Sequence, residues 1–298
     1  MNGRKIEWPT LGLLVMCYAL WAFATTWLAE TLLPAAILLT GLTITLYASL
    51  CHEIIHGHPC AWHRLNAALV FPSLTVFIPF GRFRDTHLDH HRDANLTDPY
   101  DDPETQFLDP ASWARLPRAV QILLNANNTL AGRLTIGPLI GQIAFMAGDI
   151  RLARAGDTRV VRSWLWHGPA LVPVFIWLTW TGTMPIWAYL IAAYFGLAVL
   201  KIRTFLEHQA HKHARGRTVI IEDRGPLALM FLNNNLHTVH HMHPRVPWYR
   251  LPGLYYPNRA SYLARNDGYH YNSYGEIFAR HFWRRKDPVP HPLWTQKR

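Results

Sequence analysis

The chain has 298 residues, of which 50% are hydrophobic and only 16% are charged. Soluble domains carry about 25% charged residues, so this composition argues against an ordinary soluble enzyme, and the abundant aromatic and aliphatic residues exclude a disordered chain. Three cysteines without a Cys-x-x-Cys pair cannot form a disulfide framework. The formal net charge of +10 is compatible with nucleic acid or anionic lipid as a partner, so the placement of the basic residues has to decide.

Four apolar segments are long enough to cross a bilayer as helices. About 20 helical residues, at 1.5 Å per residue, cover the ~30 Å hydrocarbon core. The first segment is too long for a signal peptide and has no cleavage site before its end. The sequence therefore predicts four membrane-spanning helices, at residues 10–29, 31–50, 164–182 and 184–200.

Basic residues are absent from both short connections between these spans. They occur before the first span, as Arg4 and Lys5, within residues 51–163, and from Lys201 onward. By the positive-inside rule this places both termini and the long middle segment in the cytoplasm. Topology accounts for the net charge, so nucleic acid is not expected as a partner.

The cytoplasmic segments contain three recognisable regions. Residues 67–80 are apolar but are interrupted by Pro72 and Pro79, which predicts a re-entrant or interfacial segment rather than a span. Repeated Asp-Pro steps predict a loop over residues 98–110. Residues 119–150 are expected to lie along the membrane surface.

The arrangement of the eighteen histidines is more informative than their number. One pair follows the second span with a spacing of four residues, and two triplets share the spacing H-x-x-H-H, so each group projects from one face of a helix. Neutral imidazole is a common metal ligand. The predicted topology brings all groups to one membrane face, and eight imidazoles exceed what one tetrahedral zinc uses, which predicts two metals. The candidate ligands are His52, His56, His87, His90, His91, His237, His240 and His241.

A further pair of histidines, His208 and His211, follows the last span, with His213 close by. The remaining histidines are expected to be solvated or hydrogen-bonded. These are His58, His63, His167, His243, His270, His281 and His291.

Two other functional classes compete for these residues. His52, Glu53 and His56 form an H-E-x-x-H string, in which two histidines bind zinc and the glutamate serves as the general base of a protease. That interpretation leaves the two triplets without a role. A metal transporter or sensor would need charged residues inside the spans, and the four spans are almost free of them.

The three histidine groups, at His52 to His56, His87 to His91 and His237 to His241, resemble the three histidine boxes of the membrane fatty acid desaturase and hydroxylase superfamily. The order of two spans, two boxes, two spans and a third box is also similar to that superfamily. The resemblance implies a non-haem di-iron centre that uses dioxygen and two electrons to attack an unactivated C–H bond. His208 is similar in position to the additional ligand of some members, and His211 competes for that role.

The resemblance implies one all-α integral membrane domain over residues 1–298, with a cytoplasmic helical cap from 51–163 and 201–298 that holds the dimetal site. Iron supplies the oxygen chemistry, so no separate catalytic side chain or organic cofactor site is expected. A fatty acyl desaturase is favoured. A hydroxylase, ketolase or monooxygenase acting on a lipid or carotenoid is the alternative, because Gly57 and Asp98-Pro99 are also similar to the carotenoid branch.

Several polar residues flank the boxes and are placed to orient the ligating rings. Glu53 and Asn234 are preferred over Asp85, Asp89, Glu207, Asn233 and Asn235. No electron-transfer motif is present, so a separate ferredoxin, rubredoxin or cytochrome with its reductase is required. A basic cytoplasmic face would steer such an acidic donor or contact anionic headgroups. Its candidate residues are Arg82, Arg84, Arg284, Arg285 and Lys286.

Overall fold

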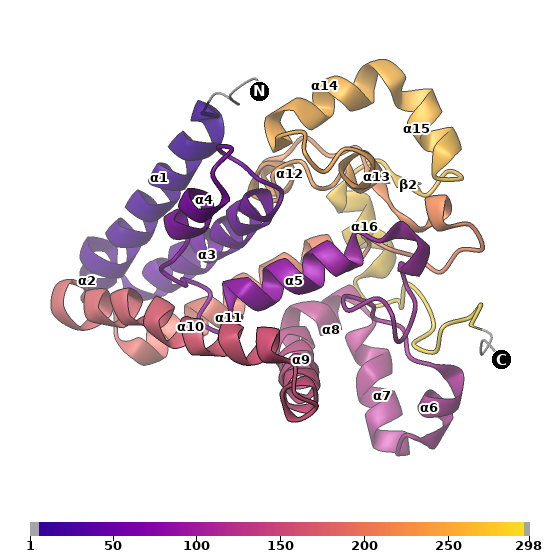
Figure 1. The fold of residues 1–298 in the computed structure, drawn as a ribbon, viewed down its shortest axis with the longest axis horizontal. Coiled ribbons are helices and arrows are strands. Elements are labelled where there is room, and N and C mark those ends of the chain that lie inside the picture. Colours follow the sequence, from indigo (N-terminus) through magenta and orange to yellow (C-terminus); the bar gives the residue numbers. More distant parts are fainter. Residues whose placement is uncertain (1–5, 295–298) are drawn as a thin grey trace. The chain divides into compact units, whose positions relative to one another are not determined.

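The computed structural model describes residues 6–294, so Arg4 and Lys5 lie outside the described residues. Helices dominate (Figure 1). The α-helices are α1 Trp8–Phe23, α2 Ala29–Thr31, α3 Leu33–Ile55, α4 His63–Leu69, α5 Phe80–His90, α6 Pro110–Arg115, α7 Arg118–Asn127, α8 Leu130–Thr135, α9 Gly137–Arg154, α10 Thr158–Ile176, α11 Ile186–Thr204, α12 Pro226–Met230, α13 His237–Met242, α14 Leu251–Tyr255, α15 Arg259–Arg265 and α16 Tyr274–His281.

Short elements complete the chain. Two π-helical turns, η1 and η3, continue α1 and α10, and short 3₁₀ turns connect the later helices. Strands β1 and β2 pair in parallel. Their bounds are η1 Ala24–Leu28, η2 Asp93–Asn95, η3 Trp177–Thr181, η4 Ala214–Arg217, β1 Ile220–Ile221, η5 Trp248–Arg250, η6 Tyr256–Asn258 and β2 His270–Tyr271.

The chain forms two compact units. The first comprises Met1–Asp85 and Pro138–Leu200, and the second comprises Thr86–Gly137 and Lys201–Arg298. The all-helical class predicted from sequence is confirmed, apart from the small two-stranded sheet in the second unit. One domain over residues 1–298 stays a prediction.

Three stretches of helix are long and apolar enough to cross a membrane. They are Trp8–Thr31, Leu33–Ile55 and Ile186–Thr204. The fourth predicted span, 164–182, is helical through α10 and η3 but is not among them. Pro169 and Pro173 lie inside it, and tryptophans reduce its mean hydropathy. The expected count of four is therefore not confirmed, although a membrane protein with several apolar helices is.

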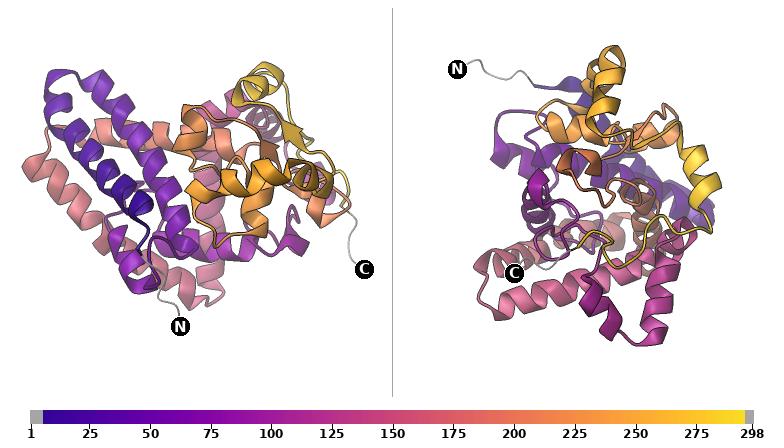
Figure 2. Two further views of the ribbon diagram at one scale, coloured as in Figure 1. Left: turned by 90° about the horizontal axis from the view of Figure 1, so that it is seen from above. Right: turned by 90° about the vertical axis from the view of Figure 1, so that its right-hand side faces the viewer.

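The first unit is built on close helix packing. Helices α1 and α3 run side by side in both views (Figures 1 and 2). Gly41 of α3 contacts α11 so closely that a Cβ there would lie 2.4 Å from Cδ1 of Phe195. One turn later, the Thr45 hydroxyl donates to the Gly196 carbonyl over 2.9 Å. Small residues and interhelical hydroxyl bonds of this kind are typical of helices that associate in lipid.

The predicted break around Pro72 and Pro79 is present, because α4 ends at Leu69 and α5 begins at Phe80. The backbone between them is buried at Val70 and Leu74. Its carbonyl groups are satisfied by side chains, since Tyr47 donates to Val70 and Tyr189 donates to Leu74. Non-helical backbone is tolerated in an apolar interior only when it is satisfied in this way.

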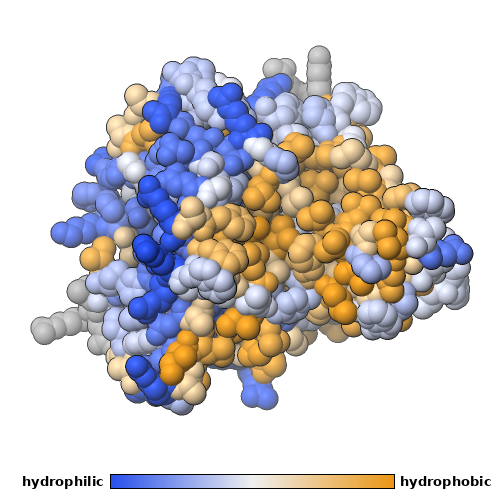
Figure 3. Space-filling model, turned by 180° about the vertical axis from the view of Figure 1, so that it is seen from behind, coloured by the Kyte–Doolittle hydropathy of each residue, from blue (hydrophilic) through white to orange (hydrophobic). Residues whose placement is uncertain are grey.

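Two other predictions concern local structure. Residues 98–109 form turns and loop without a helix, as the Asp-Pro steps predict. Residues 119–150 fall in α7, α8 and α9, and their place along the membrane surface stays a prediction. A broad area of one face is hydrophobic (Figure 3), and Trp8, Val15 and Trp27 are exposed, as expected for helices that contact lipid.

The second unit has a small core that supports α13. Ile220 of β1, Leu236, Val239, Leu251, Tyr255 and Tyr262 are buried together. β1 and β2 pair with Ile220 opposite His270. Leu236 and Val239 fix one side of α13 in this core, so the histidines at 237, 240 and 241 project from its other side.

Candidate metal centre

His52 and His56 lie at the end of α3 in the first unit. The helix continues past the predicted span, so His52 is in its last turn and His56 is the C-cap residue. Their ring centroids are 4.8 Å apart. The carboxylate of Glu53 is buried, and its Oε1 atom lies 3.8 Å from Nδ1 of His52, which is longer than a hydrogen bond. The orienting role expected of Glu53 stays a prediction.

Four buried or half-buried histidines of the second unit point their Nε2 atoms at one another. Nε2 of His208 lies 2.8 Å from Nε2 of His90 and 3.0 Å from Nε2 of His237. Nε2 of His241 lies 3.1 Å from Nε2 of His237. All four ligand atoms are within 4.8 Å of one another. We call this set, His90, His208, His237 and His241, the four-histidine group.

The outer nitrogens of two of these rings are bound to polar side chains. Nδ1 of His90 donates to Asp102 over 2.8 Å, and Nδ1 of His237 donates to Asn234 over 3.1 Å. The Asn234 amide in turn donates to Glu207 over 3.1 Å. The orienting role predicted for Asn234 is thus consistent with its contacts.

Three more histidines of the second unit form a second set, His87, His91 and His240, which we call the three-histidine group. Nε2 of His91 lies 3.0 Å from Nε2 of His87 and 3.1 Å from Nε2 of His240. Nδ1 of His87 donates to Glu104 over 3.1 Å. These rings repeat the inward arrangement of the four-histidine group, with a carboxylate again on an outer nitrogen.

Burial and neighbouring charges shift the pKa values of these rings in different directions. Burial lowers the pKa of His90, but the charges of Glu104 and Asp102 and the hydrogen bond to Asp102 outweigh it and raise the pKa to about 9. Burial, followed by the neighbouring imidazoles, holds the pKa values of His208 and His237 well below the ordinary value. Burial raises the pKa of Glu207, although Arg203 opposes this. These shifts favour the protonated form of His90 and the neutral forms of His208 and His237.

This donor set fits a bound metal ion. The Asn234 oxygen can only accept, so Nδ1 of His237 carries the hydrogen and Nε2 presents a lone pair. That lone pair faces two other ring nitrogens at 3.0 and 3.1 Å, which cannot all be satisfied by hydrogen bonds among neutral rings. Nδ1 of His208 is also buried without a hydrogen-bond partner among residues 6–294. A divalent cation satisfies the converging lone pairs and replaces the His90 proton.

The geometry favours His208 over His211 as the additional metal ligand. His208 belongs to the four-histidine group, whereas His211 lies with His213 and Asp267 in a separate, more exposed cluster. His58, one of the histidines expected to have an ordinary role, has its Nδ1 atom 2.8 Å from Glu7.

The predicted basic face needs one correction. Arg82 is only 8% exposed and pairs with Asp149 over 2.9 Å, so this guanidinium is not available at a surface. Lys286 is half-buried and donates to the His208 carbonyl. Arg284 and Arg285 are exposed. The positions of arginines and lysines in the sequence do not show which of them form buried ion pairs with acidic residues.

Asp102 and Glu104 are the two contacts that the sequence interpretation missed. Both lie in the Asp-Pro loop after the second histidine box, 12 residues from His90 and 17 residues from His87 respectively. The sequence could have suggested these contacts, because the acidic residues of the loop closely follow two candidate ligands. From its Asp-Pro steps, this loop is interpreted only as a segment that forms turns.

Comparison with known proteins adds an independent finding. Residues 25–274 match the family model described as "Fatty acid desaturase". This range includes all three histidine boxes and His208. None of the curated proteins compared with the chain matches it.

Proposed function

The chain belongs to the fatty acid desaturase family, and from that premise we propose that it is an oxygen-dependent membrane fatty acyl desaturase with a non-haem di-iron centre. Membership implies an oxidoreductase, and the histidine groups fit a metal site. The single observation that carries the proposal is the convergence of Nε2 atoms from three separate segments, at His90, His208 and His237. Such convergence has no use in a structural core, because buried imidazoles normally find acceptors.

We assign one iron to the four-histidine group and the second to the three-histidine group. The H-x-x-x-H pair at His52 and His56 completes the second set in this proposal, because the box pattern of the family assigns it a ligating role. Two irons, when bound, would supply the activation of dioxygen that removes hydrogen from an unactivated C–H bond.

The chain's own residues hold and orient the ligands. Asp102 fixes the ring of His90 by accepting from its Nδ1, and the carboxylate increases the electron density at Nε2. A relay from Asn234 to Glu207 does the same for His237, and Glu207 is anchored by Arg203 at 2.9 Å. Glu104 bridges the two groups, since one oxygen accepts from His87 and the other lies 3.9 Å from His90.

The proposed partners follow from chemistry that the chain lacks. An acyl lipid is the substrate, and the bilayer is its source, because three stretches of helix are long and apolar enough to cross a membrane. A separate ferredoxin, rubredoxin or cytochrome with its reductase supplies electrons. Of the basic residues predicted for such a donor, Arg84, Arg284 and Arg285 are exposed. We further propose that both termini and the metal site are cytoplasmic.

Metal content and oxygen dependence test this proposal together. Protein purified in detergent should contain two irons per chain, and ferrous iron, dioxygen and a reducing partner should restore activity to metal-free protein. Lipid profiles of expressing cells should then show new double bonds. Hydroxylated or keto products with the same metal content would favour the alternative within the family, a hydroxylase, ketolase or monooxygenase acting on a lipid or carotenoid.

A single zinc with proteolysis and no use of dioxygen would overturn the proposal in favour of the H-E-x-x-H protease. Glu53→Gln separates the two, because it removes the general base of a protease. In a di-iron oxidase the same change impairs activity without eliminating it. A matched control is Glu30→Gln, at an exposed glutamate of α2.

A further inference from the structure

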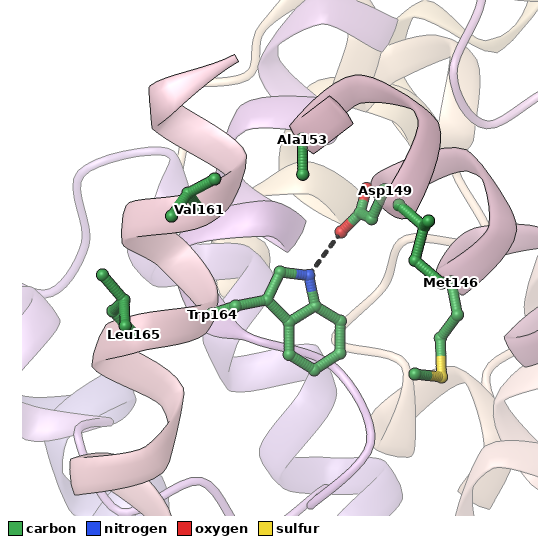
Figure 4. A pocket seen from close by; sticks show the side chains of 7 residues that line it. Met146, Asp149, Ala153, Val161, Trp164 and Leu165 are labelled. Atoms are coloured by element: carbon green, nitrogen blue, oxygen red, sulfur yellow. Dashed lines mark hydrogen bonds between the residues drawn. The ribbon is translucent and has the colours of Figure 1, made fainter. Parts of the chain in front are cut away.

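Helices α9 and α10 of the first unit line an open cavity of about 390 Å³ (Figure 4). Ligand pockets of about 300–1,000 Å³ with mainly apolar and aromatic walls are typical of small-molecule sites. The walls are formed by Met146, Ile150 and Ala153 of α9 and by Val161, Trp164 and Leu165 of α10.

The one acidic residue of the wall carries no free charge. Asp149 is 4% exposed and forms an ion pair with Arg82 at 2.9 Å. The Trp164 indole donates to the same carboxylate over 2.8 Å (Figure 4). Because Asp149 is neutralised, the cavity favours an uncharged hydrocarbon chain over a polar ligand.

Exposed apolar side chains extend the cavity along both helices. On α9, Leu139, Ile143, Met146 and Ile150 are all exposed, and their spacing of four, three and four residues places them on one face. On α10, Val161 and Leu165 are exposed one turn apart. This surface is suited to lipid rather than to water.

Arginines cluster where the two helices meet. Arg151, Arg154, Arg159 and Arg162 are exposed, and Arg154 continues the α9 stripe one turn beyond Ile150. Arg159 pairs with Asp157 over 3.2 Å, whereas Arg151 and Arg154 form no ion pair with any residue between 6 and 294. The hairpin is thus cationic at its tip and apolar along its length.

We propose that this hairpin is a binding site for one anionic phospholipid of the bilayer. An acyl chain fills the cavity, and Arg151 and Arg154 bind the phosphate of the headgroup. The arrangement matches the polarity of such a lipid, with a negative charge at one end and hydrocarbon at the other. This lipid is a ligand of the hairpin and is independent of the substrate of the metal centre.

Native mass spectrometry of the metal-loaded protein, after addition of phosphatidylglycerol or phosphatidylcholine in micelles, tests this site. One phosphatidylglycerol per chain should remain bound. Arg151→Gln with Arg154→Gln should weaken its binding about thirtyfold, since each basic residue near an anionic surface contributes roughly a factor of five. Phosphatidylcholine binding should change little. The matched control, Arg115→Gln with Arg118→Gln, removes the same charge from exposed positions on α6 and α7 and should retain the lipid.

Ala153→Trp fills the cavity and should reduce binding of both lipids. Equal retention of phosphatidylglycerol by the arginine variant and its control would overturn the proposal. So would a second copy of the chain, in place of lipid, on the unmodified hairpin. Because Arg151 and Arg154 are exposed and unpaired, their variant should fold even if Ala153→Trp does not.

Discussion

The two units satisfy their buried polar groups in different ways. In the first unit, hydroxyls of Thr25, Thr43 and Ser49 donate to the carbonyl four residues earlier in the same helix, over 2.8, 2.7 and 3.2 Å. Such bonds are complete within one helix. Lipid offers no partners to a polar group, so this self-sufficiency is what a membrane helix requires.

In the second unit, the buried polar groups come from distant segments and depend on one another. His90 is held by Asp102, His237 is held by Asn234, and both rings direct Nε2 toward His208. The arrangement of these inward nitrogens fits a bound cation. We infer that the stability of the apolar helices of the first unit, up to His52, is independent of metal, whereas the stability of the second unit depends on it.

Removing one inward imidazole should have the largest effect, because it should abolish metal binding in the second unit and leave the first unit inserted in the membrane. His237→Ala removes a nitrogen that faces both His208 and His241, so iron content should fall and desaturation should drop below detection while membrane insertion persists. Metal analysis and product assay measure both. His63→Ala, at an exposed histidine of α4, should leave both unchanged. Full activity of the His237 variant would contradict the ligand assignment.

Chelation should separate the two units by their stability. A ligand at a thousandfold excess over its Kd stabilises the native state by about 4 kcal/mol, and chelation should remove that contribution from the second unit and leave α3 before His52 unaffected. Hydrogen exchange by mass spectrometry should rise within α13 and α15, and α3 before His52 should stay protected. A uniform increase in both units would show that they do not differ in metal dependence.

The sequence predicted that these histidines lie together, because helical spacing alone aligns His237, His240 and His241 on one face of α13; their role as ligands stays a prediction. It predicted the loop at 98–110 for the same local reason, since Asp-Pro steps act on adjacent residues. It could not show that Asp102 in that loop reaches His90, or that Arg82 is buried against Asp149. Those contacts depend on how distant segments pack, which no local pattern encodes.

The span at 164–182 illustrates a different limit. Absence of charge marked it as a membrane helix, but Pro169, Pro173 and the tryptophans give it a lower mean hydropathy than the other three segments. Conversely, α3 extends to Ile55 because nothing in its sequence ends the helix at the membrane boundary. Composition thus predicted that helices form, and it did not fix where they begin and end.

Changing a carboxylate that accepts a hydrogen bond from a ligand ring should reduce metal affinity and activity less than removing the ligand does. Asp102→Asn keeps the shape of the side chain but weakens acceptance from Nδ1 of His90, and loss of such a contact typically costs about 10–100-fold in metal affinity or activity. Iron titration followed by product assay measures this. Asp101→Asn, at the exposed neighbour, is the control. Equal behaviour of the two variants would remove Asp102 from the centre.

A helix contact in the first unit should affect stability without affecting metal. Gly41→Ala places a Cβ 2.4 Å from Phe195 and 2.8 Å from the Ala192 carbonyl, and overpacking of this kind costs about 1–3 kcal/mol. Thermal unfolding in detergent should show the loss, with two irons retained. Gly12→Ala, where a Cβ meets nothing within 4 Å, should not destabilise the protein. Loss of iron from the Gly41 variant would mean that the units are coupled.

Acid sensitivity provides the smallest test, and it concerns the second unit away from its histidine groups. Glu222 accepts from Arg259 at 2.6 Å, from Tyr255 at 2.7 Å and from His270 at 2.9 Å. Its pKa is lowered to about 2, chiefly by the hydrogen bond with Arg259. A lowered pKa means that the folded state binds the proton less readily than the unfolded state, so this contribution to stability is complete above the ordinary pKa of 4.5 and decreases as the pH falls toward 2.

Unfolding measured across that acidic range should therefore be less dependent on pH in Glu222→Gln than in the unmodified protein, because the variant has no proton to gain. Glu30→Gln in α2 should leave the pH dependence unchanged, since the exposed carboxylate has no comparable set of donors among the described residues. If the Glu222 variant kept the full slope, acid sensitivity would have to come from other carboxylates. Glu222 would then make no measurable contribution to the acid sensitivity of the second unit.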